Sequence, residues 1–402
     1  MTTPDAPVAP AARYDSLDLL RGIAVLMIFS VNIRAMLQPF FEQGDPTVWG
    51  GPHDLAVDRA LQFVVDGKWI AVFALLFGAG LMLLHEKAAT AGAEPQDRIV
   101  RRQAWLIGFG LVHMVFIWLG DILVSYGVVG LVAMTLLGRR TRTVALWAAG
   151  SFAIGLVLLW GSGAVMAMIP AEEVAASPFS PAALVEAEMT AKAGSIVDQL
   201  NWRAGAAALL VGNVLVAGPM VLSYMLVGVL AFRSGFLLAR WPVVRYVVVG
   251  VTFLATAWAI DAWRVASMGV WDGGGGDYDI LVAGYMWVGL IEGLIGGLSY
   301  AALVNAAVAA GLRFAPLSAA GRMAFSNYIA CSVIGTTLAA GHGAGLLGEV
   351  TLVQAMIVVG LTWLAILVVS PLWLRAFRYG PSEWLWRSLV YGERQPFLNR
   401  SG

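Results

Sequence analysis

The chain contains little of what a soluble protein needs. Charged residues make up only 12% of its 402 residues, and acidic and basic residues balance at 25 each. Soluble domains usually carry about 25% charged residues, and a neutral chain offers no basic field for nucleic acid. The single cysteine, Cys331, excludes an internal disulfide and a zinc site built on cysteines. The 4 histidines are widely scattered, so we expect no bound metal.

Hydrophobic residues, in contrast, make up 59% of the chain and fall in long runs. Runs that could cross about 30 Å of hydrocarbon predict about ten transmembrane helices. They lie near residues 17–38, 62–85, 103–119, 121–138, 144–169, 204–231, 245–262, 279–310, 323–341 and 350–374. The sequence therefore predicts an all-α, polytopic membrane bundle of helices in a lipid bilayer.

The charges between these runs predict the orientation of the bundle. Basic residues gather in alternate segments such as "RRTRT" and "RSGFLLARWPVVR", whereas the other loops are acidic. Because basic loops stay in the cytoplasm, we expect both termini to be cytoplasmic and the protein to lie in a bacterial inner (plasma) membrane. The expected organisation is a disordered tail (1–15), an N-terminal half (16–170), an extracytoplasmic loop (171–203) and a C-terminal half (204–395).

Ionisable side chains inside a span are costly in hydrocarbon, so each one is a candidate functional residue. In the first run Arg21 precedes Asn32 by 11 residues, and in the third Arg102 precedes His113 by 11. This spacing brings two side chains to nearly the same face of a helix, about 16 Å apart along its axis. Each helix thus combines a cation near the inner rim with a polar group in the outer half.

This arrangement suits a long ligand with an anionic head inside and a reactive end near the outer leaflet, such as acyl-coenzyme A (acyl-CoA). The candidate phosphate-binding residues are Arg21, Arg101, Arg102, Arg322 and Arg387. In the candidate catalytic set, His113 or His53 is the base and Asn32 orients a group or stabilises the oxyanion. The alternative is that the arginines anchor the inner rim and that Asn32 and His113 hydrogen-bond between helices.

Two acidic residues in the apolar runs are further candidates. Asp121 lies at a corner between two predicted helices in "GLVHMVFIWLGDILVSYG", where it can cap the second helix, orient His113, or do both. Glu292 lies inside "YMWVGLIEGLIGGLSY", where we expect it to be protonated or paired within the bundle. A proton relay through Glu292 and His113 would instead indicate a transporter.

Three parts of the chain together resemble the YeiB-like family of bacterial membrane proteins, a domain of unknown function. They are "SLDLLRGIAVLMIFSVNI" with "FALLFGAG", then "RRQAWLIGFGLVHMVFIWLGDILVSYGVVGL", and finally "GRMAFSNYIACS" with "FRYGPSEWLWRSLVYGERQP". The first part also looks like the opening helix of the wider transmembrane acyltransferase superfamily. The acyltransferase-3 branch has a catalytic histidine where this chain has Asn32. The heparan-α-glucosaminide N-acetyltransferase branch has asparagine there and a catalytic histidine in the next outer loop, where this chain has His53.

The resemblance and the spacing together lead us to expect a membrane-embedded acyltransferase. It would move an acyl group from cytoplasmic acyl-CoA to a hydroxyl or amine on an envelope glycan, lipid or small molecule. The other interpretations are a proton-coupled small-molecule transporter or exporter and a non-catalytic partner of another membrane protein. A homo-oligomer is compatible with each of them.

Overall fold

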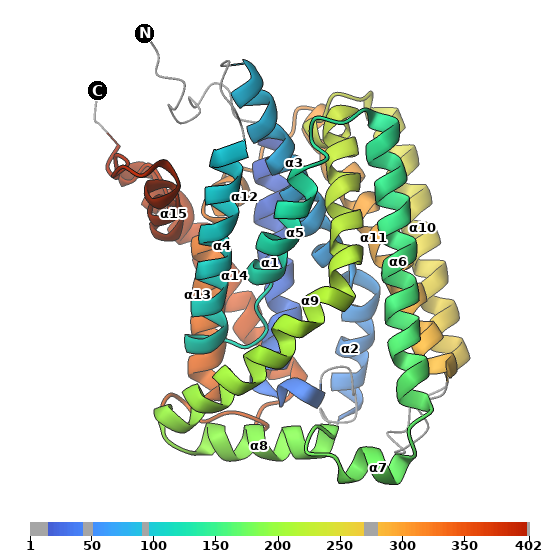
Figure 1. The fold of residues 1–402 in the computed structure, drawn as a ribbon. Helices are drawn as coiled ribbons and strands as arrows, with labels where there is room; N and C mark the ends of the chain where they lie inside the picture. The colour runs from blue at the N-terminus through green and yellow to red at the C-terminus, as the bar shows by residue number, and fades with distance from the viewer. Residues whose placement is uncertain (1–14, 43–50, 91–95, 269–279, 400–402) are drawn as a thin grey trace.

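The chain folds into a bundle of helices (Figure 1). The computed structural model describes residues 15–42, 51–90, 96–268 and 280–399. The expected tail lies outside these residues except for Asp15, which begins the first helix. A helix suits apolar runs because it satisfies its own backbone hydrogen bonds in hydrocarbon. The helices are α1 (Asp15–Leu37), α2 (Pro52–Val64), α3 (Lys68–Thr90), α4 (Gln96–Phe116), α5 (Leu123–Met134), α6 (Thr141–Ala167), α7 (Ala171–Ala176), α8 (Pro181–Ala193), α9 (Ile196–Arg233), α10 (Val243–Met268), α11 (Ile280–Ala309), α12 (Ala315–Arg322), α13 (Ala324–Ala339), α14 (Leu352–Ala376) and α15 (Pro381–Tyr391), with 3-10 turns η2 (Phe40–Glu42) and η4 (Phe236–Leu238).

The helices of the described residues include 7 that are long and apolar enough to cross a membrane. These are α1, Pro52–Thr90 (α2 with α3), α6, α9, α10, α11 and α14. The other expected runs are also helical, but α5 has 12 residues and α13 has 16, or about 18 and 24 Å of helix. α4 is long enough, yet Asp97 and three arginines occupy its first two turns. Charge and length therefore separate these three helices from the other candidates.

Two of the candidate spans bury little of their surface inside the protein. Only 22% of the most apolar stretch of α6 and 17% of that of α10 is buried. Large apolar side chains such as Leu146, Val157, Val244 and Val251 are exposed on them. An apolar surface of this extent is rare on soluble monomers, so these helices support a protein that is embedded in lipid.

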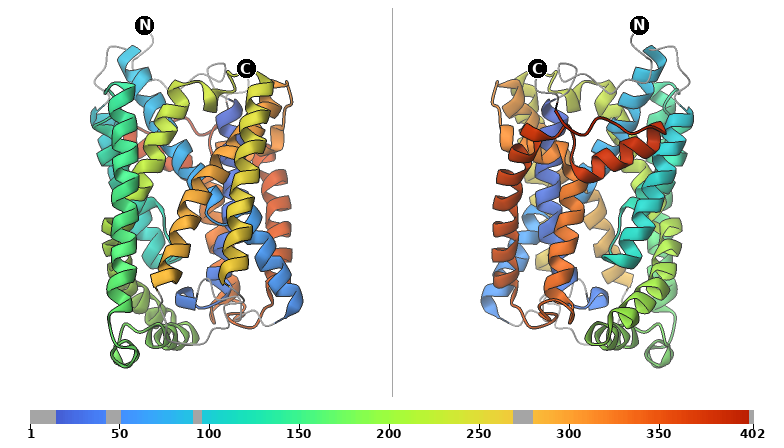
Figure 2. Two further views of the ribbon diagram at one scale, coloured as in Figure 1. Left: turned by 90° about the vertical axis from the view of Figure 1, so that its right-hand side faces the viewer. Right: turned by 90° about the vertical axis from the view of Figure 1, so that its left-hand side faces the viewer.

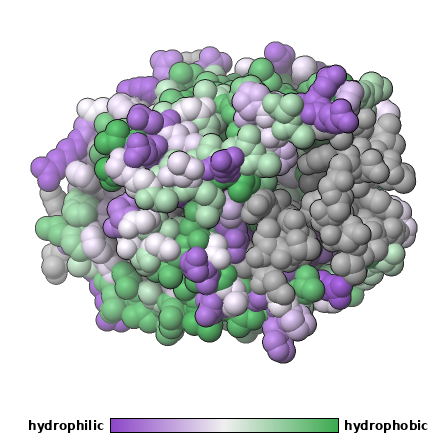
Figure 3. All heavy atoms as spheres, turned by 90° about the horizontal axis from the view of Figure 1, so that it is seen from below, coloured by the Kyte–Doolittle hydropathy of each residue, from purple (hydrophilic) through white to green (hydrophobic). Residues whose placement is uncertain are grey.

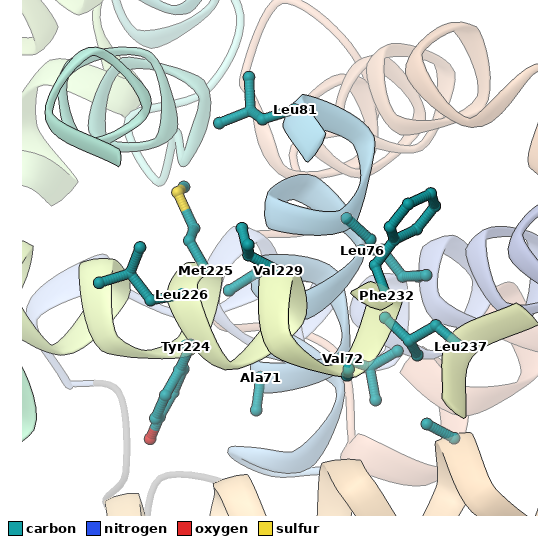
Figure 4. Close-up of a cluster of buried hydrophobic side chains, with 14 of the residues drawn as sticks. Ala71, Val72, Leu76, Leu81, Tyr224, Met225, Leu226, Val229, Phe232 and Leu237 are labelled. Carbon is teal, nitrogen blue, oxygen red and sulfur yellow. The ribbon is translucent and has the colours of Figure 1, made fainter. Parts of the chain in front are cut away.

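The core lies where α3 crosses α9 (Figure 4). Its side chains include Ala71, Val72 and Leu76 of α3 and Met225, Leu226 and Val229 of α9. The two backbones meet at Gly78 and Gly228: a Cβ on Gly228 would lie 2.0 Å from the carbonyl oxygen of Leu75. Small residues allow membrane helices to approach this closely, which is how they gain van der Waals contact.

The Gly228→Ala variant is expected to be destabilised by about 1–3 kcal/mol, because the added methyl group meets backbone and forces the helices apart. Gly212→Ala in the same helix is the matched control, since nothing lies within 4 Å of its Cβ position. Thermal unfolding of the two purified variants should give a clearly lower melting temperature for Gly228→Ala than for Gly212→Ala. Equal melting temperatures would contradict the close approach of α3 and α9.

The segment between the two expected halves is helical. Residues 171–203 contain α7, α8 and the start of α9, which has 38 residues and is about 57 Å long. α7 and α8 lie across the end of the bundle, and α9 changes direction along its length (Figure 1). Pro219 lies inside α9 and accounts for such a bend, since proline breaks the ladder of helical hydrogen bonds. Hydrophilic and hydrophobic side chains are interspersed on this end (Figure 3).

Candidate functional site

A cavity of about 320 Å³ opens at the end of the bundle where α1 begins. It is enclosed by α1, α3, α4, the start of α5, the end of α12, the start of α13, the segment that joins α14 to α15, and α15 itself. α15 lies across the bundle at this end and not along its axis (Figures 1 and 2). α15 is amphipathic and closes one side of the cavity. Since α1 lies near the N-terminus and α15 near the C-terminus, both ends of the chain contribute to the cavity.

Basic side chains dominate the mouth of this cavity, which is called the inner cavity below. Arg21, Lys87, Arg98, Arg102, Arg322, Arg378 and Arg387 line it, against the two carboxylates Asp18 and Glu383. Four of the five arginines predicted to bind phosphate are among them, whereas Arg101 is exposed on α4 outside the lining. Lys87, Arg98 and Arg378 could not be assigned from sequence, because only the fold brings their helices together. The cavity therefore favours an anionic ligand.

Arg102 is held by aromatic contacts. Its guanidinium carbon lies 4.0 Å from the ring centre of Trp386 on α15 and 6.0 Å from that of Phe77 on α3. The indole N–H of Trp386 donates to the Arg102 carbonyl oxygen at 3.2 Å. Stacking leaves the guanidinium N–H groups at its edge free for anions, so Trp386 orients Arg102 without neutralising it.

Glu383 is occupied by a structural role. Its Oε1 accepts hydrogen bonds from the backbone N–H groups of Phe325 and Ser326 at 2.7 and 3.1 Å, and Oε2 accepts from the Ser326 hydroxyl at 2.5 Å. It therefore caps the first turn of α13 from α15. Burial raises the pKa of Glu383, although these hydrogen bonds act in the opposite direction. The contact explains why "GRMAFSNYIACS" and "FRYGPSEWLWRS" occur together: they dock on each other.

The deep end of the inner cavity is apolar. It is formed by Phe73, Leu76, Leu106, Ile122 and Leu123, together with Tyr126 and Tyr328. Polarity thus falls from a basic mouth to an apolar end. On α4 the lining residue Leu106 is followed after two turns, on the same face, by His113.

His113 and Asp121 form a buried pair just beyond this apolar end. The Nδ1 atom of His113 lies 2.9 Å from Oδ2 of Asp121, and their side chains are 1% and 0% exposed. Oδ1 of Asp121 accepts the backbone N–H of Val124 at 2.9 Å, so Asp121 also caps the first turn of α5. Both alternatives drawn from the sequence are present together. A Cβ on Gly110 would lie 2.6 Å from Asp121 Oδ1, so this glycine makes room for the carboxylate.

Two aromatic rings separate His113 from cavities on opposite sides. The Tyr328 ring, which lines the inner cavity, is centred 5.0 Å from the imidazole. The Trp118 ring lies 6.4 Å away, edge to face, and lines a second cavity of about 250 Å³ at the other end of the bundle. Neither cavity contains His113 in its lining. The histidine therefore lies one side chain away from each.

Three other candidates from the sequence lie outside this arrangement. Asn32 is half-buried on α1, and His53 is exposed in the first turn of α2; neither lines the inner or the second cavity.

Glu292 is buried beside Lys68, with Oε1 2.7 Å from Nζ, and Lys68 also contacts Asp261 at 3.0 Å. Lys68, which was not among the candidates drawn from the sequence, is fully buried at the start of α3, and the two carboxylates compensate its charge.

Comparison with known proteins gives one family and several full-length relatives. Residues 231–393 match a family model described as a protein of unknown function (DUF418). The chain is 30% identical over 414 residues to the uncharacterized protein YeiB of Escherichia coli strain K12, which covers 97% of this chain and 99% of the relative. It is 27% identical over 417 residues to the uncharacterized protein YxaH of Bacillus subtilis strain 168, with 98% of each chain covered. The two relatives match nearly the whole chain, whereas the family model covers only its C-terminal part.

Proposed function

The chain belongs to the YeiB-like family, and from this premise we propose that it is a membrane-embedded acyltransferase. The donor is cytoplasmic acyl-CoA, and the acceptor is a hydroxyl or amine at the extracytoplasmic side. One observation carries the proposal: a basic cavity narrows to an apolar end that stops beside a buried His–Asp pair. The resemblance of the first helix to acyltransferases is a further motive for the proposal, but the positions it marks, Asn32 and His53, line neither cavity.

The proposed topology has ten crossings of the bacterial inner (plasma) membrane with both termini in the cytoplasm. The basic cavity, the start of α1 and α15 lie at one end of the bundle. The α5–α6 turn adds Arg139, Arg140 and Arg142 to the same side in this topology. Basic residues of this density mark the cytoplasmic side. The short α5 and α13 count as crossings because protein surrounds parts of them.

The cavity suits each part of the donor. The phosphates of acyl-CoA would bind the arginines at the mouth, where charge-assisted and bidentate hydrogen bonds are strongest. The pantetheine arm would lie against the apolar end, and the thioester would face His113 once the Tyr328 ring moves aside. The same residues would serve a soluble anion less well, because an apolar end offers it no hydrogen bonds.

The reaction needs a base and two substrates. The acceptor oxygen or nitrogen attacks the thioester carbonyl carbon, so that a C–O or C–N bond forms and the C–S bond breaks. His113 takes the acceptor proton and returns it to the departing CoA thiolate. Asp121 orients the imidazole and stabilises its protonated form. Neither ring nitrogen of His113 makes a hydrogen bond of good geometry among the described residues, but Nδ1 faces Oδ2 of Asp121 at 2.9 Å, so Nε2 is the atom that accepts the proton.

The test uses protein in lipid nanodiscs with radiolabelled acetyl-CoA and palmitoyl-CoA. We expect at least one of them to bind and to release free CoA thiol when membrane extract is added as acceptor. Absence of both binding and thiol release for both donors would overturn the proposal. The same nanodiscs loaded with CoA lacking an acyl group show whether the phosphates alone account for binding.

A second candidate function, proton-coupled transport, rests on the buried pair of Glu292 and Lys68. Buried ionisable groups within spans commonly carry protons in transporters. The two cavities, which lie on opposite sides of His113 and its flanking rings, also fit alternating access. In that case Glu292→Gln would abolish proton-driven uptake or efflux in vesicles while the protein still folds. Normal thiol release by Glu292→Gln protein would favour the acyltransferase.

A further inference from the structure

The second cavity, here called the outer cavity, shares no lining residue with the inner one. It lies between the end of α1, η2, the end of α4, α8, the first turns of α9, and α13. Its inner wall is Trp118, whose ring is edge to face with both His113 and Phe40 at 6.4 Å. A molecule bound there would approach His113 from the side opposite to the acyl donor.

The polar part of the outer cavity carries more positive than negative charge. Glu188 is fully buried, with Oε1 2.5 Å from the ammonium of Lys192, and its Oε2 accepts the Phe40 N–H at 2.7 Å. The Arg203 guanidinium donates to the Ile117 carbonyl oxygen at 2.6 Å. Lys192 and Arg203 against Glu188 leave one positive charge, so an anionic group is the complementary ligand.

The rim of the outer cavity is apolar and exposed. Phe116, Ile196 and Val333 line the cavity and are 62%, 54% and 44% exposed. Val333 lies six residues before the end of α13 at Ala339, about 9 Å deeper along the helix axis. In a spanning bundle that depth is below the head groups. The cavity therefore opens sideways into hydrocarbon as well as towards the polar end.

We propose that the outer cavity binds the acceptor, and that the acceptor is a lipid whose head group carries an anionic phosphate and a free hydroxyl. This inference rests on the proposed acyltransferase function. Lys192 and Arg203 would hold the phosphate, Phe116 and Val333 would contact the hydrocarbon, and the hydroxyl would reach His113 past Trp118. The hydroxyl oxygen forms the new ester bond, its proton passes to His113, and CoA leaves with the C–S electron pair.

The experiment supplies labelled acyl-CoA to nanodiscs of phosphatidylcholine, with or without phosphatidylglycerol, or with soluble glycerol phosphate. Phosphatidylglycerol has the proposed head group, phosphatidylcholine lacks the hydroxyl, and glycerol phosphate lacks the hydrocarbon. We expect label in the lipid fraction only with phosphatidylglycerol. Equal transfer to glycerol phosphate, or transfer only to other acceptors, would overturn the lipid assignment. If no donor is bound or consumed in any arm, the proposed acyltransferase function fails instead.

Two variants link the result to this cavity. Val333→Trp should block the sideways opening and lower transfer to phosphatidylglycerol at least tenfold, while Val247→Trp on the exposed face of α10 should not.

The double variant Lys192→Met with Glu188→Gln removes the charge pair without leaving a buried carboxylate alone, and it should raise the KM for the lipid. Arg59→Met, which removes an exposed cation elsewhere, is its control. Unchanged lipid kinetics in both cavity variants would overturn the proposal.

Discussion

Substitution of His113 by glutamine is expected to lower the rate of acyl transfer by about 10²–10⁴-fold, the usual contribution of a general base. Glutamine keeps hydrogen-bonding capacity at this buried position but cannot accept a proton at neutral pH. The affinity for acyl-CoA should stay unchanged, because His113 lies outside the lining of the donor cavity. Thiol release and donor binding are measured on the same nanodiscs.

His85→Gln is the matched control, since His85 lies on α3 near Gly138 and away from the pair. A purely structural His113, which only hydrogen-bonds between helices, would lower the melting temperature on substitution and leave the turnover of folded protein intact. That outcome would remove His113 from the mechanism.

Asp121→Asn separates the roles of its partner: the amide oxygen still caps Val124, but the charge beside the imidazole is lost. We expect a fall in turnover with little change in melting temperature.

Replacing Arg102 with alanine is expected to weaken acyl-CoA binding by about 10- to 100-fold, since a hydrogen bond to a charged group contributes roughly 1.5–3 kcal/mol. The loss should be in donor affinity and not in the turnover of saturated enzyme, because Arg102 is about three helical turns from His113. Titration with acetyl-CoA measures the change, and higher ionic strength should reduce the difference.

Arg245→Ala gives a close control for this variant. Arg245 stacks on Trp241 at 3.7 Å, as Arg102 stacks on Trp386 at 4.0 Å, but it does not line the inner cavity. Its removal should leave donor binding unchanged. Equal affinities in Arg102→Ala and wild-type protein would mean that Arg102 is only an anchor of the inner rim.

Part of the site could be predicted from local sequence alone. The interval from Arg102 to His113 places both on one helical face, and the position of Asp121 at a corner allowed a helix cap, a contact with His113 or both. The interval from Arg21 to Asn32 predicted the same for α1: Arg21 lines the inner cavity, and Asn32, like His113, lines neither cavity. Helical periodicity gives the direction of a side chain from its own axis, but not which neighbour it meets.

The residues missed from the sequence are those whose partners lie far along the chain. Lys68 was not a candidate in the sequence, because its partners Asp261 and Glu292 lie about 200 residues later in the chain. Glu383 likewise has no feature in the sequence that indicates its cap on α13. Their signals are weak because a single charge at the end of an apolar run has the same appearance whether it is solvated or paired.

By itself the sequence determined the class of the protein: an all-helical chain with long apolar runs, few charges and an arginine in the first two turns of each of two helices. Only the tertiary structure decided that seven basic side chains surround one cavity, that Trp118 and Tyr328 flank His113, and that exposed apolar side chains line a second cavity. The physical reason is that hydrophobicity and periodicity act within one helix, whereas a cavity is the space that several packed helices leave between them.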